Sequence, residues 1–212
     1  SAGTAGCSVT SGGVISYANA GTCTITATKA ADTNYTSVSS AAQTFTVSKA
    51  SQSSLINVGA STTAWPATLG LTITGGSGTG ALAYSISSAG TAGCSVGASS
   101  GIVTPTTAGT CDIAITRAAD TNYNISSTLT PTVTFAQASQ STLTTCAQTI
   151  ADPASFANAT TSGGSGGGAV TYALTSAGTA GCSVTSGGVI SYADASTCTI
   201  TATKAADTNY TS

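Results

Sequence analysis

Apolar residues occupy every second position over several short stretches of this chain, a pattern that predicts β-strands with one buried face. In the clearest stretch, Leu82, Tyr84 and Ile86 alternate with smaller or polar residues. The same reasoning places further strands near residues 54–58, 69–73, 94–96, 101–104, 111–116 and 128–135. Glycine-rich stretches such as GGSGTG lie between strands and suit hairpin turns. The pattern therefore predicts an all-β fold in which two sheets pack face to face.

The chain repeats itself at long range. The motif SAGTAGCSV begins at Ser1, Ser88 and Ser176, and the motif ASQS begins at Ala50 and Ala138. The period of 87 or 88 residues is far longer than a solenoid turn and suits one immunoglobulin-like sandwich. We therefore expect tandem immunoglobulin-like β-sandwich modules of about 88 residues.

The phase of the repeat divides the chain into three parts. Residues 1–49 are expected to be the C-terminal part of one repeat, residues 50–137 a complete repeat, and residues 138–212 a repeat without its last strand. We interpret the chain as a section of a longer array whose short linkers favour a stiff rod. The alternative is that neighbouring chains donate the missing strand, as in β-augmentation.

Composition removes several classes of function. Only 5% of the residues are charged, against roughly 25% in a typical soluble domain, and the net charge of −2 provides no basic surface for nucleic acid. No apolar run is long enough to span a membrane. The chain contains neither His nor Glu, so the usual general acids and bases are missing, and we expect neither an enzyme nor a cofactor. A hydrophobic content of 41% argues against a disordered Ser/Thr/Gly stalk.

Six of the seven cysteines form a recurring pair, 16 or 17 residues apart: Cys7 with Cys23, Cys94 with Cys111, and Cys182 with Cys198. The second cysteine of each pair shares strand parity with inward apolar residues, which predicts a disulfide in each core. Two thiols without His or CxxC spacing cannot complete a zinc site, so we expect no metal. Because the chain has few aromatic residues to fill a core, the disulfides are expected to be needed for stability. Persistent disulfides predict an extracellular or cell-surface location.

Cys146 lies outside this plan, because its counterpart one repeat earlier is Val58. Two alternatives stay open. The thiol is either buried as a small hydrophobic group or bonded to a partner chain.

Each cysteine-bearing strand is followed by the sequence ADTNY, which predicts a structural loop. Aspartate suits a turn and tyrosine can pack its ring there, so the expected loop residues are Asp32, Tyr35, Asp120, Tyr123, Asp207 and Tyr210. A basic residue, Lys29, Arg117 or Lys204, stands three positions before each Asp. It predicts either a loop ion pair or a contact between repeats. Calcium is a weaker alternative, because its sites recruit several oxygens and each copy has one Asp.

The segments GTCTITATKAADTNY, TGGSGTGALAYSI and KASQSSL resemble tandem bacterial Ig-like repeats of large secreted and surface proteins. The resemblance covers essentially the whole chain, although the middle copy departs from it with CDIAITR and one extra residue between its cysteines. It implies stalks, adhesins and filaments, and it implies no particular ligand.

Together these observations predict a structural module of an extracellular stalk or fibre, with neighbouring repeats as its partners. One alternative is a self-assembling surface filament, in which copies of the chain meet through strands or Cys146. Another is an adhesin whose loops bind carbohydrate or a surface. Trp65 has no counterpart in the other copies and is expected to fill the core.

Overall fold

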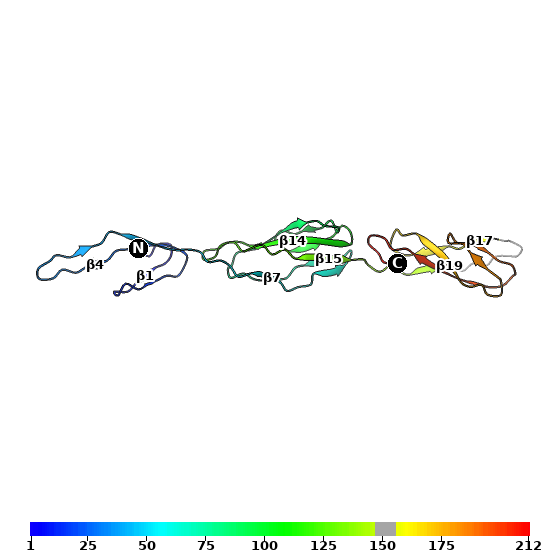
Figure 1. Cartoon of the computed structure of the whole chain (residues 1–212), viewed down its shortest axis with the longest axis horizontal. Helices are drawn as coiled ribbons and strands as arrows, with labels where there is room; N and C mark the ends of the chain where they lie inside the picture. Colours follow the sequence, from blue (N-terminus) through cyan, green and yellow to red (C-terminus); the bar gives the residue numbers. More distant parts are fainter. Residues whose placement is uncertain (147–155) are drawn as a thin grey trace.

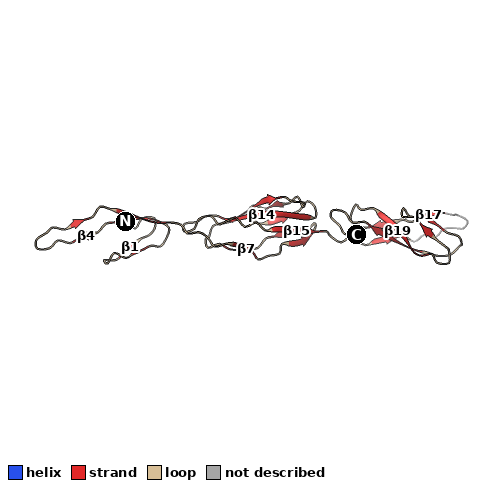
Figure 2. Ribbon diagram, viewed as in Figure 1, coloured by secondary structure: helices blue, strands red, loops and turns tan. Residues whose placement is uncertain are grey.

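The structure, a computed structural model, describes residues 1–146 and 156–212. The all-β prediction is confirmed, since the described residues form strands, turns and loops without a helix (Figure 2). The strands gather into three units that lie end to end along one long axis (Figure 1). We call them the first unit (β1–β6), the central unit (β7–β15) and the third unit (β16–β22).

The first unit consists of three separate strand pairs, β1 with β2, β3 with β6, and β4 with β5. Their bounds are β1 (Ser8–Val9), β2 (Ile15–Ser16), β3 (Gly21–Ile25), β4 (Thr28–Lys29), β5 (Val38–Ser39) and β6 (Gln43–Val47). Ala5 and Cys23 are buried, but most of the larger side chains are exposed. This unit therefore has strand pairing without a covered core.

The central unit has two facing layers. A four-stranded sheet has the order β11-β14-β15-β8, a three-stranded sheet has the order β12-β13-β9, and β10 pairs with β7. The strands are β7 (Leu55–Asn57), β8 (Thr62–Ala64), β9 (Leu69–Gly70), β10 (Ile73–Gly75), β11 (Leu82–Ser88), β12 (Ser95–Val96), β13 (Ile102–Thr104), β14 (Gly109–Arg117) and β15 (Thr132–Ala136).

The core of the central unit follows the alternation of the sequence. Ile113 and Ile115 of β14 are fully buried, as are Val133 and Phe135 of β15, while the residues between them are more exposed. Leu69 of β9, the ring of Tyr84 of β11 and Leu71, which lies between β9 and β10, join the same cluster. Because the inward residues of several strands meet in one cluster, the sheets enclose a single core.

The structure corrects two details of the predicted strands. The strand expected over residues 69–73 is divided, because β9 pairs with β13 whereas β10 pairs with β7, so the chain passes from one sheet to the other. Strand β8 is a parallel partner of β15 that the sequence did not indicate. Its three residues are too few to show an alternating pattern.

The third unit repeats much of the central one. Its strands are β16 (Leu143–Thr145), β17 (Phe156–Asn158), β18 (Thr161–Gly163), β19 (Val170–Ser176), β20 (Ser183–Val184), β21 (Val189–Ser191) and β22 (Thr199–Lys204). The pair β19–β22 has the register of β11–β14, including a register shift near the end of the first strand in both. Within the described residues, β19 is the only strand that pairs with β22.

Candidate functional site at the joints between units

Each unit contains one disulfide, Cys7–Cys23, Cys94–Cys111 or Cys182–Cys198. The Cα atoms are 6.0 to 6.2 Å apart, a separation that a disulfide ordinarily spans. Cys23 and Cys111 are almost fully buried, with 1% and 2% of their surface exposed. The bridges therefore tie β3 and β14 to the turn-rich segment that precedes them in the chain.

The aspartate of the ADTNY loop organises its own turn. One carboxylate oxygen of Asp120 accepts hydrogen bonds from the backbone N–H groups of Asn122 and Tyr123, both at 2.9 Å. The other accepts from the backbone N–H of Thr79 at 2.6 Å, which ties the loop to the glycine-rich hairpin. These bonds, that of Thr79 first, lower the pKa of Asp120 below its ordinary value.

Asp207 makes the same arrangement in the third unit. It accepts hydrogen bonds from the backbone N–H groups of Asn209 at 2.8 Å, Tyr210 at 2.9 Å and Gly167 at 2.5 Å. These bonds, with that of Asn209 first, lower its pKa, and the nearby charge of Lys204 adds to the effect. In the first unit, Asp32 likewise accepts hydrogen bonds from the backbone N–H groups of Asn34 and Tyr35 in its own turn.

The glycines of the hairpin are required because the ADTNY loop lies directly against them. A Cβ atom at Gly78 would lie 2.5 Å from a carboxylate oxygen of Asp120, and one at Gly80 would lie 2.0 Å from the carbonyl oxygen of Ala118. Arg117 donates a hydrogen bond to the carbonyl oxygen of Gly80 at 2.9 Å. Two motifs that are about 40 residues apart in the sequence therefore form one packed end of the unit.

The glutamine of ASQS joins these two motifs. The side-chain amide of Gln52 donates to the carbonyl oxygens of Ala118 and Asn124, at 3.1 and 2.8 Å, and its oxygen accepts from the N–H of Gly78 at 3.3 Å. Gln140 does the same in the third unit, donating to Ala205 and accepting from two backbone N–H groups of the hairpin. The linker is thereby fixed to the unit that follows it.

The first joint is made by the asparagine of the ADTNY loop. The side-chain oxygen of Asn122 in the central unit accepts a hydrogen bond from the backbone N–H of Ala20 in the first unit at 2.7 Å, and its amide donates to Asn19 at 3.2 Å. The carbonyl oxygen of Asn122 accepts from the N–H of the linker residue Ala50 at 2.8 Å. One asparagine thus binds both the preceding unit and the linker.

The second joint has the same geometry. The side-chain oxygen of Asn209 accepts from the backbone N–H of Ala108 at 2.8 Å, and its carbonyl oxygen accepts from the N–H of Ala138 at 2.9 Å. The expectation that Trp65 fills the core is wrong, because its ring packs against the ring of Tyr210 in the next unit. Their ring centroids are 5.4 Å apart with the rings nearly perpendicular, a favourable edge-to-face contact.

The loop residues expected from the sequence therefore lie together at one end of each unit. Tyr123 and Tyr210 form isolated bridges with Ala50 and Ala138, respectively, while Tyr35 is 75% exposed in the loop between β4 and β5. The contact between repeats is real, but asparagine makes it rather than the basic residue. From the sequence, the asparagine of ADTNY was expected only to be part of a structural loop, and Gln52 had no predicted role. The signal available was their recurrence at fixed positions of the repeat.

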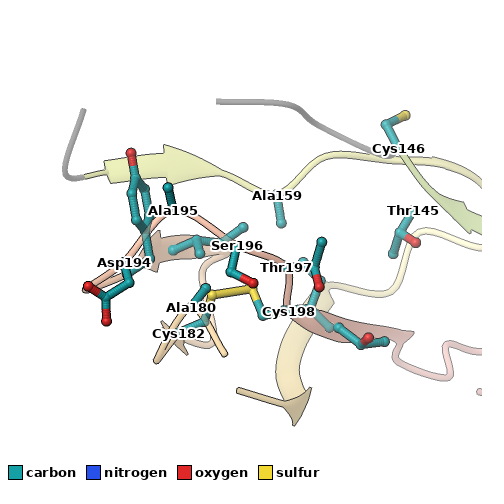
Figure 3. A pocket seen from close by; sticks show the side chains of 14 residues that line it. Thr145, Cys146, Ala159, Ala180, Cys182, Asp194, Ala195, Ser196, Thr197 and Cys198 are labelled. Atoms are coloured by element: carbon teal, nitrogen blue, oxygen red, sulfur yellow. A yellow bond between two sulfur atoms is a disulfide. The ribbon is translucent and has the colours of Figure 1, made fainter. Parts of the chain in front are cut away.

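Cys146 is a free cysteine and is exposed, so the alternative of a buried thiol is wrong, while a bond to a partner chain stays a prediction. It lies on the rim of a groove in the third unit (Figure 3). No cluster of three or more His, Cys, Asp or Glu side chains that could hold a metal occurs in the part of the chain that the structure describes. Nor do the described residues contain a helix of membrane-spanning length and apolarity.

The chain was compared with protein-family models and with curated proteins, and neither comparison gives a match.

Proposed function

We propose that this chain is a structural element of an extracellular stalk or fibre, built from tandem immunoglobulin-like sandwiches of about 88 residues. The observation that carries the proposal is the repeated joint. Asn122 and Asn209 each bind a backbone N–H of the preceding unit and the first residue of their own linker. A connection made twice with the same partners sets a constant geometry between neighbours, which is what a rod requires.

The hydrogen bonds at the joint also act against bending. The linker is held along its length, because the side chains of Lys49 and Gln52 bind backbone carbonyls of the central unit's ADTNY loop and its flanks. A linker with free rotation would instead behave as a flexible coil. Few charged residues and many exposed hydroxyl groups leave a surface suited to a passive spacer.

The proposed extracellular location rests on the disulfides. The chain has three disulfides within 212 residues. Such disulfides persist in an oxidising compartment, whereas in the cytosol cysteine thiols are kept reduced. Purification of the chain from an oxidising and from a reducing expression host tests this, with free thiols counted by mass spectrometry after alkylation. A chain that folds fully with every thiol reduced would contradict the proposed location.

Small-angle X-ray scattering of the 212-residue chain tests the stalk itself. We expect the distance distribution of a stiff rod, with an early maximum set by the width of one unit and a long tail. A compact, symmetric distribution would contradict the proposal, and so would the scattering of a flexible chain of beads. The adhesin alternative stays a prediction, and binding of the chain to immobilised glycans tests it separately.

A further inference from the structure

The disulfide of the central unit closes a loop that contains the residue contacted by the following unit. The bridge joins Cys94 to Cys111, and Ala108 lies between them, three positions before the second cysteine. The backbone N–H of Ala108 donates a hydrogen bond to the side-chain oxygen of Asn209 in the third unit at 2.8 Å. We call residues 94–111 the receptor loop of the central unit, because this loop receives the asparagine of its neighbour.

The first unit has the same relationship between bridge and contact. Its disulfide joins Cys7 to Cys23, and Ala20 lies three positions before the second cysteine. The backbone N–H of Ala20 donates to the side-chain oxygen of Asn122 in the central unit at 2.7 Å. Residues 7–23 are therefore the receptor loop of the first unit, and both joints use a loop that a disulfide closes.

The turn before Ala108 is held by the segment that precedes the first cysteine of the bridge. The carbonyl oxygen of Ala92 accepts hydrogen bonds from the backbone N–H groups of Thr106 and Thr107, at 2.9 and 3.1 Å. The hydroxyl group of Thr107 also donates to the carbonyl oxygen of Thr91 at 2.9 Å. The position of the Ala108 N–H therefore depends on where this preceding segment lies.

The bridge fixes the preceding segment against β14. Ala92 is fully buried and lies two residues before Cys94, whose partner Cys111 belongs to β14. The backbone N–H of Ala92 donates to the carbonyl oxygen of Thr110 at 3.1 Å, next to the bridge. Hydrogen bonds compete with water, so each holds a position only weakly, whereas the disulfide is covalent. The shape of the receptor loop is thus expected to depend on its bridge.

All three units build this turn in the same way. In the first unit the carbonyl oxygen of Ala5 accepts from the backbone N–H groups of Ala18 and Asn19, at 3.0 and 3.1 Å. Ala180 has this role in the third unit, and Figure 3 shows it beside the disulfide of that unit. The side chains of the turn differ between the units, so the feature that recurs is the shape of its backbone.

The aromatic contact across the second joint depends on the same loop. The indole N–H of Trp65 donates to the carbonyl oxygen of Thr106 at 3.3 Å, and the ring of Trp65 packs against the ring of Tyr210. A displacement of the receptor loop would therefore disturb this ring contact together with the hydrogen bond from Ala108.

We propose that the disulfide of a unit positions the receptor loop for the unit that follows, so that loss of the bridge uncouples these two units. The inference rests on the proposed structural role and gives the bridges a function besides stability. It also has a direction. The central unit meets the first unit through Asn122 and the third unit through Ala108. Loss of its bridge should therefore loosen the second joint and leave the first joint intact.

NMR relaxation of backbone ¹⁵N nuclei in the 212-residue chain tests this direction, in a Cys146→Ser background that removes bonding through the free thiol. We expect the three units of this reference chain to tumble as one body. In the variant Cys94→Ala/Cys111→Ala the third unit should tumble faster, while the first and central units stay coupled. The matched variant Cys7→Ala/Cys23→Ala should instead uncouple the chain at the first joint.

Hydrogen exchange at single amides gives a second measurement. In the variant without the central bridge, exchange of the Ala108 amide should rise by at least about fivefold, the factor that loss of one ordinary hydrogen bond produces. Exchange of the Ala20 amide should stay unchanged. The amides of Ile113 and Ile115 in the core report whether the central unit is still folded.

If the central unit does not fold without its bridge, Thr107→Val decides, because it keeps the disulfide and removes the hydrogen bond from the hydroxyl group to Thr91. It should raise exchange at Ala108 but not at Ala20. Thr72→Val is the control, since Thr72 is exposed and lies outside the receptor loop. No rise at Ala108 in Thr107→Val would then overturn the proposal.

The results separate this inference from the proposed stalk. Units that tumble independently in the reference chain would overturn the stalk. A reference chain that moves as one body, combined with a folded bridge variant that keeps its second joint or loses both joints equally, would overturn the positioning role alone.

Discussion

The side-chain oxygen of Asn122 lies 2.7 Å from the backbone nitrogen of Ala20, across the boundary between two units. The backbone N–H of the same residue donates a hydrogen bond to a carboxylate oxygen of Asp120 and so helps to form the turn. A residue type that is common in turns therefore also fixes how two units meet. Asn209 and Ala108 repeat the arrangement at the next boundary.

The asparagines should control stiffness rather than folding. Asn122→Ala removes the two side-chain hydrogen bonds to Asn19 and Ala20 across the first joint, and Asn209→Ala removes the one to Ala108 across the second. Each bond is worth about 1 kcal/mol. We expect the units to keep their melting temperature while small-angle scattering shows a broader range of end-to-end distances. Asn34→Ala is the matched control, because Asn34 occupies the same motif position at the exposed outer end of the first unit. Equal effects of all three substitutions would contradict the assigned role.

The central unit should be destabilised by a single methyl group at one glycine of the glycine-rich hairpin but not at a glycine of strand β9. Gly80→Ala places Cβ 2.0 Å from the carbonyl oxygen of Ala118, and the backbone has to move. We expect a loss of about 1 to 3 kcal/mol in the unfolding free energy of the central unit. Gly70→Ala should be close to neutral, since no atom lies within 4 Å of its Cβ position. Thermal unfolding followed by circular dichroism distinguishes the two variants.

The disulfide of the central unit should contribute a large share of its stability. Replacing Cys94 and Cys111 together by Ala releases a loop of 17 residues, which costs about 3 kcal/mol on the chain-entropy model. We expect faster hydrogen exchange in β14, measured by mass spectrometry, and a lower melting temperature. Cys146→Ser is the control for loss of a sulfur atom outside a bridge. Unchanged exchange in the double variant would show that the bridge does not stabilise the unit.

Acid should loosen the loops at the joints. The pKa values of Asp120 and Asp207 lie below their ordinary 3.8, because the Thr79 N–H binds the first carboxylate most strongly and the Asn209 N–H the second. A carboxylate whose pKa is lower in the folded than in the unfolded state stabilises the fold above the unfolded value. That contribution disappears as the pH falls through the folded value. We expect a constant melting temperature near neutrality and a decrease below about pH 4.

The variant Asp120→Asn/Asp207→Asn tests whether these two carboxylates cause the decrease of the melting temperature at low pH. It should melt at a lower temperature than the natural chain at pH 7 and show a smaller decrease on acidification. Asp194→Asn removes one negative charge outside these turns and serves as the control. If the double variant follows the same pH profile as the natural chain, other groups are responsible for the acid sensitivity.

The strands were predictable because burial in a sheet leaves a period of two in the sequence. Ile113 and Ile115 could be placed in the core for that reason, and the structure buries both completely. Strand β8 was not predictable, since three residues carry no period and its pairing with β15 depends on the tertiary fold. The division of the predicted strand at Leu71 could not be predicted either. Residues on both sides of it alternate in the same way, so the pattern does not show that β9 and β10 join different sheets.

The joint was only partly visible in the sequence. Recurrence of ADTNY pointed to a conformation that every copy needs, but a turn and a contact between units use the same residue types. Trp65 was misplaced because a lone aromatic residue ordinarily fills a core, whereas here its partner Tyr210 comes from the following unit. Such a partner cannot be inferred without knowing which ends of two units face each other.

The donor to the side-chain oxygen of each joint asparagine is a main-chain N–H, which every amino acid except proline can supply. Adjacent copies can therefore drift apart in their surface side chains without losing the coupling between them. Deletion or duplication of a whole copy brings together ends that still match. In the proposed stalk, the number of copies can thus change during evolution by genetic recombination alone, without the need for a new interface.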